Sequence, residues 1–152
     1  NNSCFDEGPV GIASYEMGET TDDILAWLNE NRPVVISTKL TRNYYAHRAW
    51  IDYRSRNEGN KTDAHAGSHA YIIVGYVQLP EVLKEEEGRY CFVVANSWGE
   101  GWGKGGHACI SERWLQEFRT INPFLAITDP DSEGSLRIGR LAVTGPAKKQ
   151  AG

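Results

Sequence analysis

The alternation of apolar and polar residues predicts one amphipathic helix near the start of the chain. Apolar side chains recur at helical spacing within residues 22–30. Thr20 or Thr21 can cap this helix, and two aspartates follow in its first turn, where the helix dipole favours negative charge. Pro33 ends it, because the residue before a proline avoids the helical region.

Short apolar runs after this helix predict β-strands, at residues 34–38, 71–77, 90–94, 107–111 and 124–128. Residues 10–15 and 136–143 are candidates for two further strands, and residues 114–119 for a helical turn. Polar and aromatic residues are interspersed in residues 41–68, which predicts a long surface loop. One helix followed by strands at hairpin spacing predicts an α+β fold with an antiparallel sheet or barrel.

Composition indicates a folded chain and excludes several kinds of partner. Among 152 residues, 40% are hydrophobic and 24% charged, so a packed core is feasible. The formal net charge is −4 and no run of Lys or Arg occurs before the last few residues, which argues against nucleic acid or an anionic membrane as a partner. The apolar stretches 70–77 and 91–95 are too short to span a bilayer. The chain begins at Asn1, so we expect a processed chain, a trimmed chain or a fragment, and its localisation stays open.

Three cysteines are too few for a disulfide scaffold. One disulfide with one free thiol, or three reduced thiols, are both compatible with the sequence. Cys91 and Cys109 fall inside predicted strands, which favours buried packing thiols. Asn60 begins a triplet of the glycosylation type, a pattern that also occurs often by chance.

Two segments carry the candidate chemistry, Gly67 to Tyr76 and Asn96 to Gly106. The first has a histidine, a small residue, an apolar strand and Gly-Tyr; the second reads Asn-Ser-Trp-Gly, two residues, and Trp-Gly. Together they resemble the histidine and asparagine segments of papain-like cysteine peptidases. The resemblance covers roughly residues 20–128, and the Asn-Ser-Trp-Gly string is its most specific part.

The resemblance assigns roles that the chemistry explains. His69 would hold a cysteine as thiolate and later protonate the leaving amine. Asn96 would orient the ring of His69 without adding charge, and Trp98 would shield their hydrogen bond from water. Gly67 and Ser68 would flank the substrate cleft.

The family's nucleophile and its oxyanion-hole glutamine have no match in the chain. The family's cysteine opens a long helix well over a hundred residues before the histidine. Cys4 lies only 65 residues before His69, and the glycine and proline that follow it cannot form that helix. A metal pair formed by His65 and His69 would need a helix, which Gly67 and the β-branched run argue against, so no metal site is expected.

The sequence therefore predicts the right lobe of a papain-like peptidase, an antiparallel β-barrel with a short N-terminal helix. Residues 1–128 would form this lobe and residues 129–152 a C-terminal strand and tail. The expected reaction is peptide-bond hydrolysis through a thioester, without a cofactor, in which a helical lobe from the same precursor or a second chain supplies cysteine and glutamine. This chain alone is then expected to be inactive. The alternatives are an inactive peptidase-derived binding or regulatory module, and another chemistry of the same fold such as transamidation.

Four aromatic residues between the predicted helix and His69 admit two interpretations: Tyr44, Tyr45, Trp50 and Tyr53. They could line a wall of the substrate cleft or anchor the long loop to the sheet, and anchoring is favoured because large aromatic side chains mostly pack. Trp102 is expected to be a packing residue. The run from Glu85 to Glu87 is expected to be a solvated hairpin tip.

Overall fold

A computed structural model describes residues 12–46, 48–54, 59–62, 67–120 and 123–130. Residues 16–126 form one compact unit, which contains all the predicted site residues. Residues 1–15 and 127–152 group in a second unit, of which only 12–15 and 127–130 are described. Cys4, His65 and the predicted strand 136–143 lie outside the described residues.

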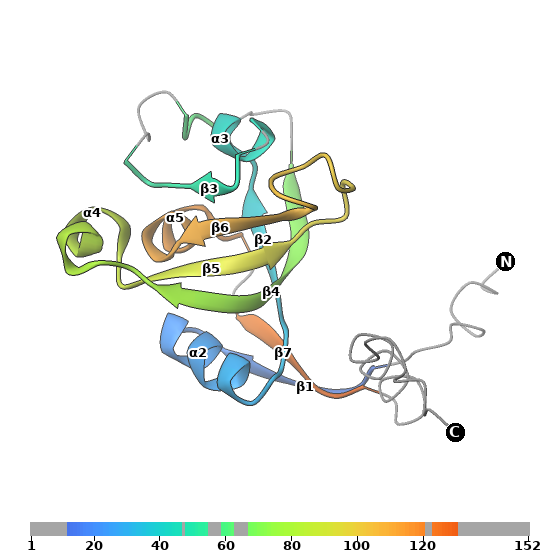
Figure 1. The fold of residues 1–152 in the computed structure, drawn as a ribbon. Coiled ribbons are helices and arrows are strands. Elements are labelled where there is room, and N and C mark those ends of the chain that lie inside the picture. The colour runs from blue at the N-terminus through green and yellow to red at the C-terminus, as the bar shows by residue number, and fades with distance from the viewer. Residues whose placement is uncertain (1–11, 47, 55–58, 63–66, 121–122, 131–152) are drawn as a thin grey trace, which may run out of the picture. The chain divides into compact units, whose positions relative to one another are not determined.

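A short strand comes first, and helix α2 and the remaining strands follow it in the order that the sequence pattern predicts (Figure 1). The strands are β1 (Ile12–Gly18), β2 (Val34–Lys39), β3 (Trp50–Ile51), β4 (Ser68–Gln78), β5 (Tyr90–Ala95), β6 (His107–Ser111) and β7 (Phe124–Pro130). The helical segments are α2 (Thr21–Asn29), α3 (Arg42–Tyr45), the 3-10 turn Glu81–Leu83, α4 (Lys84–Glu87) and α5 (Glu112–Phe118). The fold is α+β, as predicted. None of the described helices is long and apolar enough to cross a membrane.

The sheet is open, so the prediction of a closed barrel is wrong. Its strand order is β1-β7-β2-β4-β5-β6-β3. The pairs β2–β4, β4–β5 and β5–β6 are antiparallel, whereas β3 runs parallel to β6. Alternating apolar residues identify the strands and their buried face, but closure depends on pairing between the first and last strands, which the pattern does not contain.

Helix α2 begins where its capping residues place it. Thr20 accepts a hydrogen bond from the Asp23 backbone N–H, and the Asp23 carboxylate accepts one from the Thr20 backbone N–H. This reciprocal pair satisfies two of the backbone donors that a helix start leaves unpaired. Ile24 and Trp27 then point into the core, at 0% and 5% exposure.

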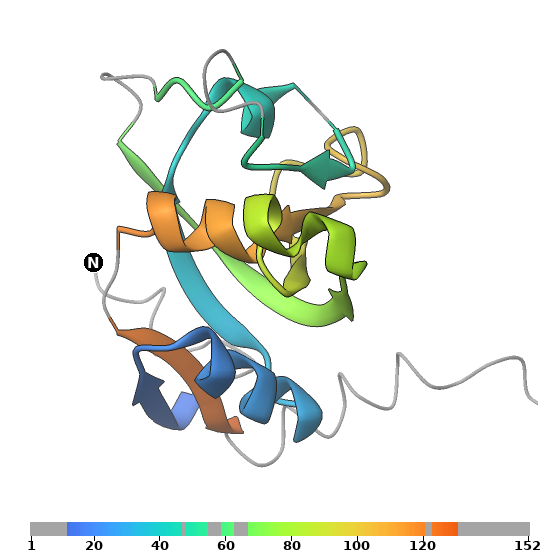
Figure 2. The ribbon, with the colours of Figure 1, turned by 90° about the vertical axis from the view of Figure 1, so that its left-hand side faces the viewer.

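The core lies between the sheet and α5. Figure 2 shows α5 and α4 side by side in front of the curved strands β2 and β4. From α5, Trp114 and Leu115 are fully buried, and from the sheet Ile36, Ile73 and Val94 meet them in one cluster. This core gives β4 and β5, the strands that carry the predicted site, a rigid support.

The segment expected to be a long surface loop is partly built into the core. It contains α3 and β3, and Tyr44 is fully buried. Asn60 is also buried: its side-chain amide donates to the backbone oxygens of Asp52 and Tyr53, at 3.1 and 3.2 Å. Its oxygen accepts the indole N–H of Trp114 at 2.9 Å. A sequence pattern does not reveal this, because the partners are distant in the chain or are backbone atoms.

The acidic run at 85–87 is not a wholly solvated tip. Glu85 and Glu86 are exposed, but Glu87 is only 1% exposed. Its carboxylate accepts the backbone N–H groups of Tyr53 and Arg54, at 2.7 and 3.0 Å. Glu87 therefore supplies hydrogen-bond acceptors to the segment after β3, which explains why a charged side chain is buried there.

Cys91 and Cys109 form a disulfide, so the interpretation as reduced packing thiols is wrong. Their Cα atoms are 5.5 Å apart on the neighbouring strands β5 and β6. The register pairs Val93 with Cys109 and Cys91 with Ser111, which places the two cysteines diagonally on one face. The pairing depends on this register, which the sequence does not show.

Candidate active site

His69 stands at the start of β4, inside the strand rather than before it. Strand β4 begins at Ser68, three residues earlier than the apolar run predicts, and His69 pairs with Thr38 of β2. The side chain is half-buried. Strand pairing on this side therefore fixes the backbone that carries the imidazole.

Asn96 follows directly after β5 and meets His69 side chain to side chain. The His69 Nε2 atom lies 2.8 Å from Asn96 Oδ1. The same oxygen accepts the backbone N–H of Ser97 at 2.8 Å. Because this N–H can only donate, the amide atom that faces it is the oxygen, and His69 Nε2 must then be the donor of its own bond. The ring is thereby held with Nδ1 left for a reacting group, as the predicted roles require.

Trp98 packs against the imidazole ring of His69. Its ring centroid lies 4.8 Å from that of His69, at an interplanar angle of 32°. Tyr45 stacks on Trp98 at 5.5 Å and 17°, while Tyr44 meets it edge-on at 5.4 Å. Trp98 is 39% exposed and Tyr45 41%, so these two rings form an aromatic wall beside the imidazole. Of the two interpretations for the aromatic residues, Tyr44 fits anchoring and Tyr45 fits a wall of the site.

A glycine-rich turn brings Asn96 back to the sheet. The Asn96 backbone N–H donates to Gly106 O at 3.0 Å, and Gly103 has a φ of 59°. A Cβ atom at Gly103 would lie 2.1 Å from His107 O, so the turn closes only without a side chain there. Trp102 from the same turn is 1% exposed and donates its indole N–H to Tyr44 O at 2.8 Å, as expected of a packing residue.

Gly67 and Ser68 lie exposed immediately before His69. Gly67 has a φ of 22°, and a Cβ added there would meet nothing within 4 Å apart from its chain neighbours. That Gly67 and Ser68 flank a substrate cleft stays a prediction.

Hydroxyl groups occupy the interior below His69, and sequence reasoning missed them. Tyr71 donates to or accepts from Thr38, with 2.9 Å between the two oxygens. Burial raises the pKa of Tyr44 and of Tyr71 above the ordinary tyrosine range, so both stay neutral. The sequence does not mark Tyr44 as a member of this cluster, because the helix that carries it, α3, has only four residues and is too short to show a periodic pattern.

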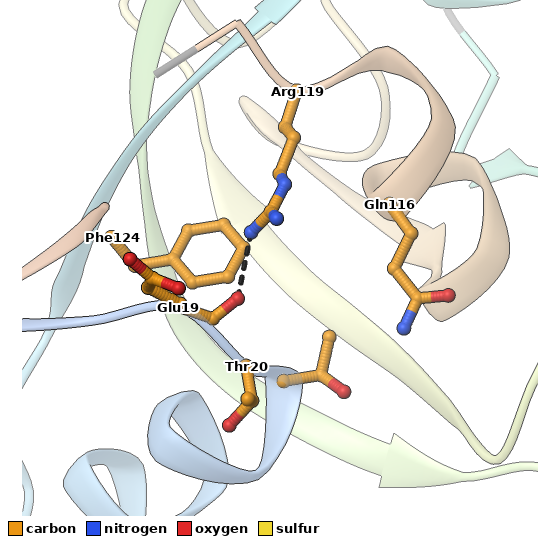
Figure 3. Close-up of a pocket in the computed structure, with 6 residues that line it drawn as sticks. Glu19, Thr20, Gln116, Arg119 and Phe124 are labelled. Carbon is orange, nitrogen blue, oxygen red and sulfur yellow. Dashed lines mark hydrogen bonds between the residues drawn. The ribbon is translucent and has the colours of Figure 1, made fainter. Parts of the chain in front are cut away.

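The described residues contain no free thiol, because the two cysteines among them form the disulfide. They also contain no group of three side chains that could hold a metal ion. A pocket of about 360 Å³ lies elsewhere in the same unit. Its lining residues, drawn in Figure 3, are Glu19, Thr20, Thr21, Gln116, Arg119 and Phe124. There Arg119 donates to Glu19 O at 2.8 Å and its guanidinium covers the ring of Phe124. None of the predicted site residues lines this cavity.

Comparison with known proteins identifies the family of this chain. Residues 6–119 match the family described as papain family cysteine protease. A cysteine protease from Blomia tropicalis is 29% identical over 107 residues, which are 66% of this chain and 27% of that protein. Falcipain-3 from Plasmodium falciparum is 41% identical over 46 residues, 28% of this chain and 9% of that protein. The Homo sapiens tubulointerstitial nephritis antigen-like protein is 26% identical over 109 residues, 70% of this chain and 22% of that protein.

Solved structures show the same fold. Xylellain, a cysteine protease from Xylella fastidiosa, superposes with a TM-score of 0.54 at 17% identity, over 78% of this chain and 41% of that one. Procathepsin B from Trypanosoma congolense gives a TM-score of 0.51 at 21% identity, over 78% and 36%. The matched part of the chain spans between about a tenth and about a quarter of the length of the three relatives compared by sequence, Falcipain-3, the nephritis antigen-like protein and the Blomia tropicalis protease. Because the family match covers most of its residues, the chain belongs to the papain family of cysteine proteases.

Proposed function

We propose that this chain is the histidine- and asparagine-bearing half of a papain-like cysteine peptidase that hydrolyses peptide bonds. The observation that carries the proposal is the hydrogen bond between His69 and Asn96, with the ring of Trp98 packed against the imidazole. Base, orienting group and water-excluding ring are three of the parts that a cysteine nucleophile needs. The fourth part, the thiolate, comes from a second lobe.

Two observations support a second lobe as the source of cysteine and glutamine. The described residues hold no free thiol, and the chain matches only part of the length of each relative.

The proposed reaction begins with the cysteine held as thiolate by the protonated ring of His69. The thiolate sulfur attacks the carbonyl carbon of the peptide bond, and a C–S bond forms as the carbonyl oxygen takes the negative charge. That charge is stabilised by the glutamine of the second lobe. His69 then gives its Nδ1 proton to the leaving amine, the C–N bond breaks, and a thioester remains.

The second half of the reaction uses the same groups in reverse. Neutral His69 takes a proton from a water molecule as the water oxygen attacks the thioester carbon. The C–S bond breaks, the carboxylic acid product leaves, and the thiolate with its imidazolium partner is restored. Asn96 keeps the ring oriented through both halves, because it accepts from Nε2 whichever charge the ring carries. No metal or organic cofactor is needed for these steps.

Labelling of the natural protein tests this proposal. The protein is isolated from its source with an affinity reagent against this chain and treated with a thiol-reactive peptidyl epoxide, and intact masses are then measured. We expect one probe on a cysteine outside residues 1–152, in a continuous or co-purifying segment, and none on this chain. A protein that takes up no probe and has no second lobe would contradict the proposal.

That negative result would favour an inactive, peptidase-derived binding module. One relative, the tubulointerstitial nephritis antigen-like protein, has a name that does not describe a peptidase, which makes this the second candidate. Against it stands the complete set of His69, Asn96 and Trp98, since a module that only binds has no chemical need for an oriented and shielded imidazole.

A further inference from the structure

Asn96 has a side-chain amide whose oxygen is fully used and whose nitrogen is not. Its Oδ1 accepts from both Ser97 N–H and His69 Nε2, which fixes the amide with Nδ2 turned away from the ring. Nδ2 is buried and has no hydrogen-bond partner among the described residues. Buried amide groups in folded proteins are almost always paired, so the orientation of Asn96 requires an acceptor for Nδ2.

Tyr44 presents the complementary group at the same site. Its ring contacts those of His69 and Trp98, at centroid distances of 6.1 and 5.4 Å, and it is 0% exposed. The Tyr44 hydroxyl is likewise buried without a partner among the described residues, and these are the two side-chain polar atoms of which this is true. A phenol oxygen accepts hydrogen bonds, and the amide nitrogen can only donate.

We propose that Tyr44 is a positioning residue: its hydroxyl accepts from Asn96 Nδ2 through one internal water molecule and so holds the amide oxygen on His69. An internal water requires two to four polar partners in an enclosed site. The Tyr44 hydroxyl and Asn96 Nδ2 provide two, and the paired hydroxyls of Thr38 and Tyr71 are further candidates beside the Tyr44 ring. The inference rests on the proposed function for its purpose, since the amide matters to the reaction only through His69.

The consequence for His69 follows from the amide alone. If Nδ2 loses its acceptor, the observed orientation leaves a buried donor unpaired, so it is less strongly favoured over the rotated one, although rotation gives up both bonds of Oδ1. In the rotated orientation a donor faces His69 Nε2 in place of the oxygen. The ring would then exchange its proton between Nε2 and Nδ1 instead of keeping it on Nε2. Tyr44 is therefore expected to influence the tautomer of the His69 imidazole through Asn96, without a direct hydrogen bond to the ring.

NMR spectroscopy of the ¹⁵N-labelled chain tests this proposal with Tyr44→Phe, which removes only the hydroxyl. We expect the solvent exchange of the Asn96 side-chain amide protons to become at least tenfold faster, and the ring nitrogens of His69 to change from one tautomer to a mixture. The matched control is Tyr45→Phe, because that ring also contacts Trp98 but is 41% exposed. Tyr45→Phe should change neither signal. Unchanged exchange and an unchanged tautomer in Tyr44→Phe would overturn the proposal.

A measurement on the unaltered chain protects the test against misfolding of the variant. If the water bridge exists, the Asn96 side-chain amide protons show a nuclear Overhauser effect to a long-lived water that also reaches the Tyr44 ring. Its absence, with amide exchange as fast as that of an exposed asparagine, would overturn the proposal by itself. Neither readout depends on peptidase activity, so failure of the epoxide labelling and failure of this inference are distinguishable.

Discussion

Glu112 joins three elements of the described fold through one buried carboxylate. It is 3% exposed and opens α5, and it accepts from Thr21 Oγ1 at 2.6 Å, from Arg89 N at 2.6 Å and from Arg89 Nη2 at 2.8 Å. Thr21 belongs to the start of α2 and Arg89 precedes β5, so loss of the charge would loosen both at once. We therefore predict that Glu112→Gln destabilises the chain far more than its small change in shape suggests.

The magnitude follows from which oxygen accepts which donor. Oε1 accepts two donors and Oε2 accepts the backbone N–H of Arg89. A glutamine has only one oxygen, so its NH₂ group must face at least one N–H or O–H donor. One charge-assisted hydrogen bond, worth about 1.5–3 kcal/mol, is lost, and a buried donor is left unpaired. Arg89 keeps its ion pair with Asp22 and is partly exposed, so the loss comes mainly from the hydrogen bond and the unpaired buried donor, and the free energy of unfolding should fall by about 2–3 kcal/mol.

The pH dependence of this difference has a definite sign. Burial raises the pKa of Glu112, but the hydrogen bonds from Arg89 and Thr21 lower it by more, so the pKa lies below its ordinary value. A carboxyl with a lowered pKa stabilises the fold above the pKa of the unfolded chain, about 4.3, and loses that contribution as the pH falls through the folded value. The difference between the wild-type chain and Glu112→Gln should therefore be full at pH 7 and shrink below about pH 4.

Urea unfolding followed by tryptophan fluorescence, at pH 7 and at several acidic values, measures both quantities. Glu117→Gln is the matched control, because Glu117 lies exposed on the same helix. A loss below about 1 kcal/mol in Glu112→Gln, or a loss equal to that of the control, would refute the reasoning, since a solvated carboxylate contributes no more than this.

Further predictions concern the residues that support the site. Asn60→Asp should lower the free energy of unfolding in urea by about 3 kcal/mol, because it replaces an amide that donates to two backbone oxygens with a buried acceptor. Because Asn60 is buried, expression in a glycosylating host should add no glycan to it, and an intact mass raised by a glycan would contradict this. Replacing Cys91 and Cys109 together by serine should cost about 3 kcal/mol in urea unfolding, the value expected for a disulfide whose cysteines are 18 positions apart, and no loss would show that the bond is not formed. Gly103→Ala should cost at least about 2 kcal/mol, whereas Gly101→Ala, where a Cβ meets nothing within 4 Å, should be close to neutral; equal effects would contradict the account of the turn.

The sequence predicts those features that depend on local pattern. Helical spacing after Thr20 and the β-branched runs locate α2 and the strands to within a few residues, because periodicity and capping are local properties. The motif around His69 and the Asn-Ser-Trp-Gly string also predict which side chains meet, and the structure brings His69, Asn96 and Trp98 together.

Features that depend on the arrangement of distant segments could not be predicted in this way. Barrel closure and the Cys91–Cys109 disulfide both depend on strand register. Glu87 is buried because backbone N–H groups more than thirty residues earlier need an acceptor, and its own neighbours are solvated acids. Tyr44 lies under the imidazole because a four-residue helix turns it inward, and no period marks so short an element.

The central claim is that His69, oriented by Asn96, activates a cysteine supplied from outside this chain. The most direct test is the rate at which a peptidyl epoxide labels that cysteine in the complete natural protein carrying His69→Ala, compared with the unaltered protein and with His107→Ala. His107 is exposed and its imidazole hydrogen-bonds to Gly105 O, away from the His69–Asn96 pair, so it serves as the control. The account predicts a loss of at least about 100-fold for His69→Ala, the usual lower range for a general acid–base group, and no change for His107→Ala. A His69→Ala protein that is labelled as fast as the unaltered one would contradict it.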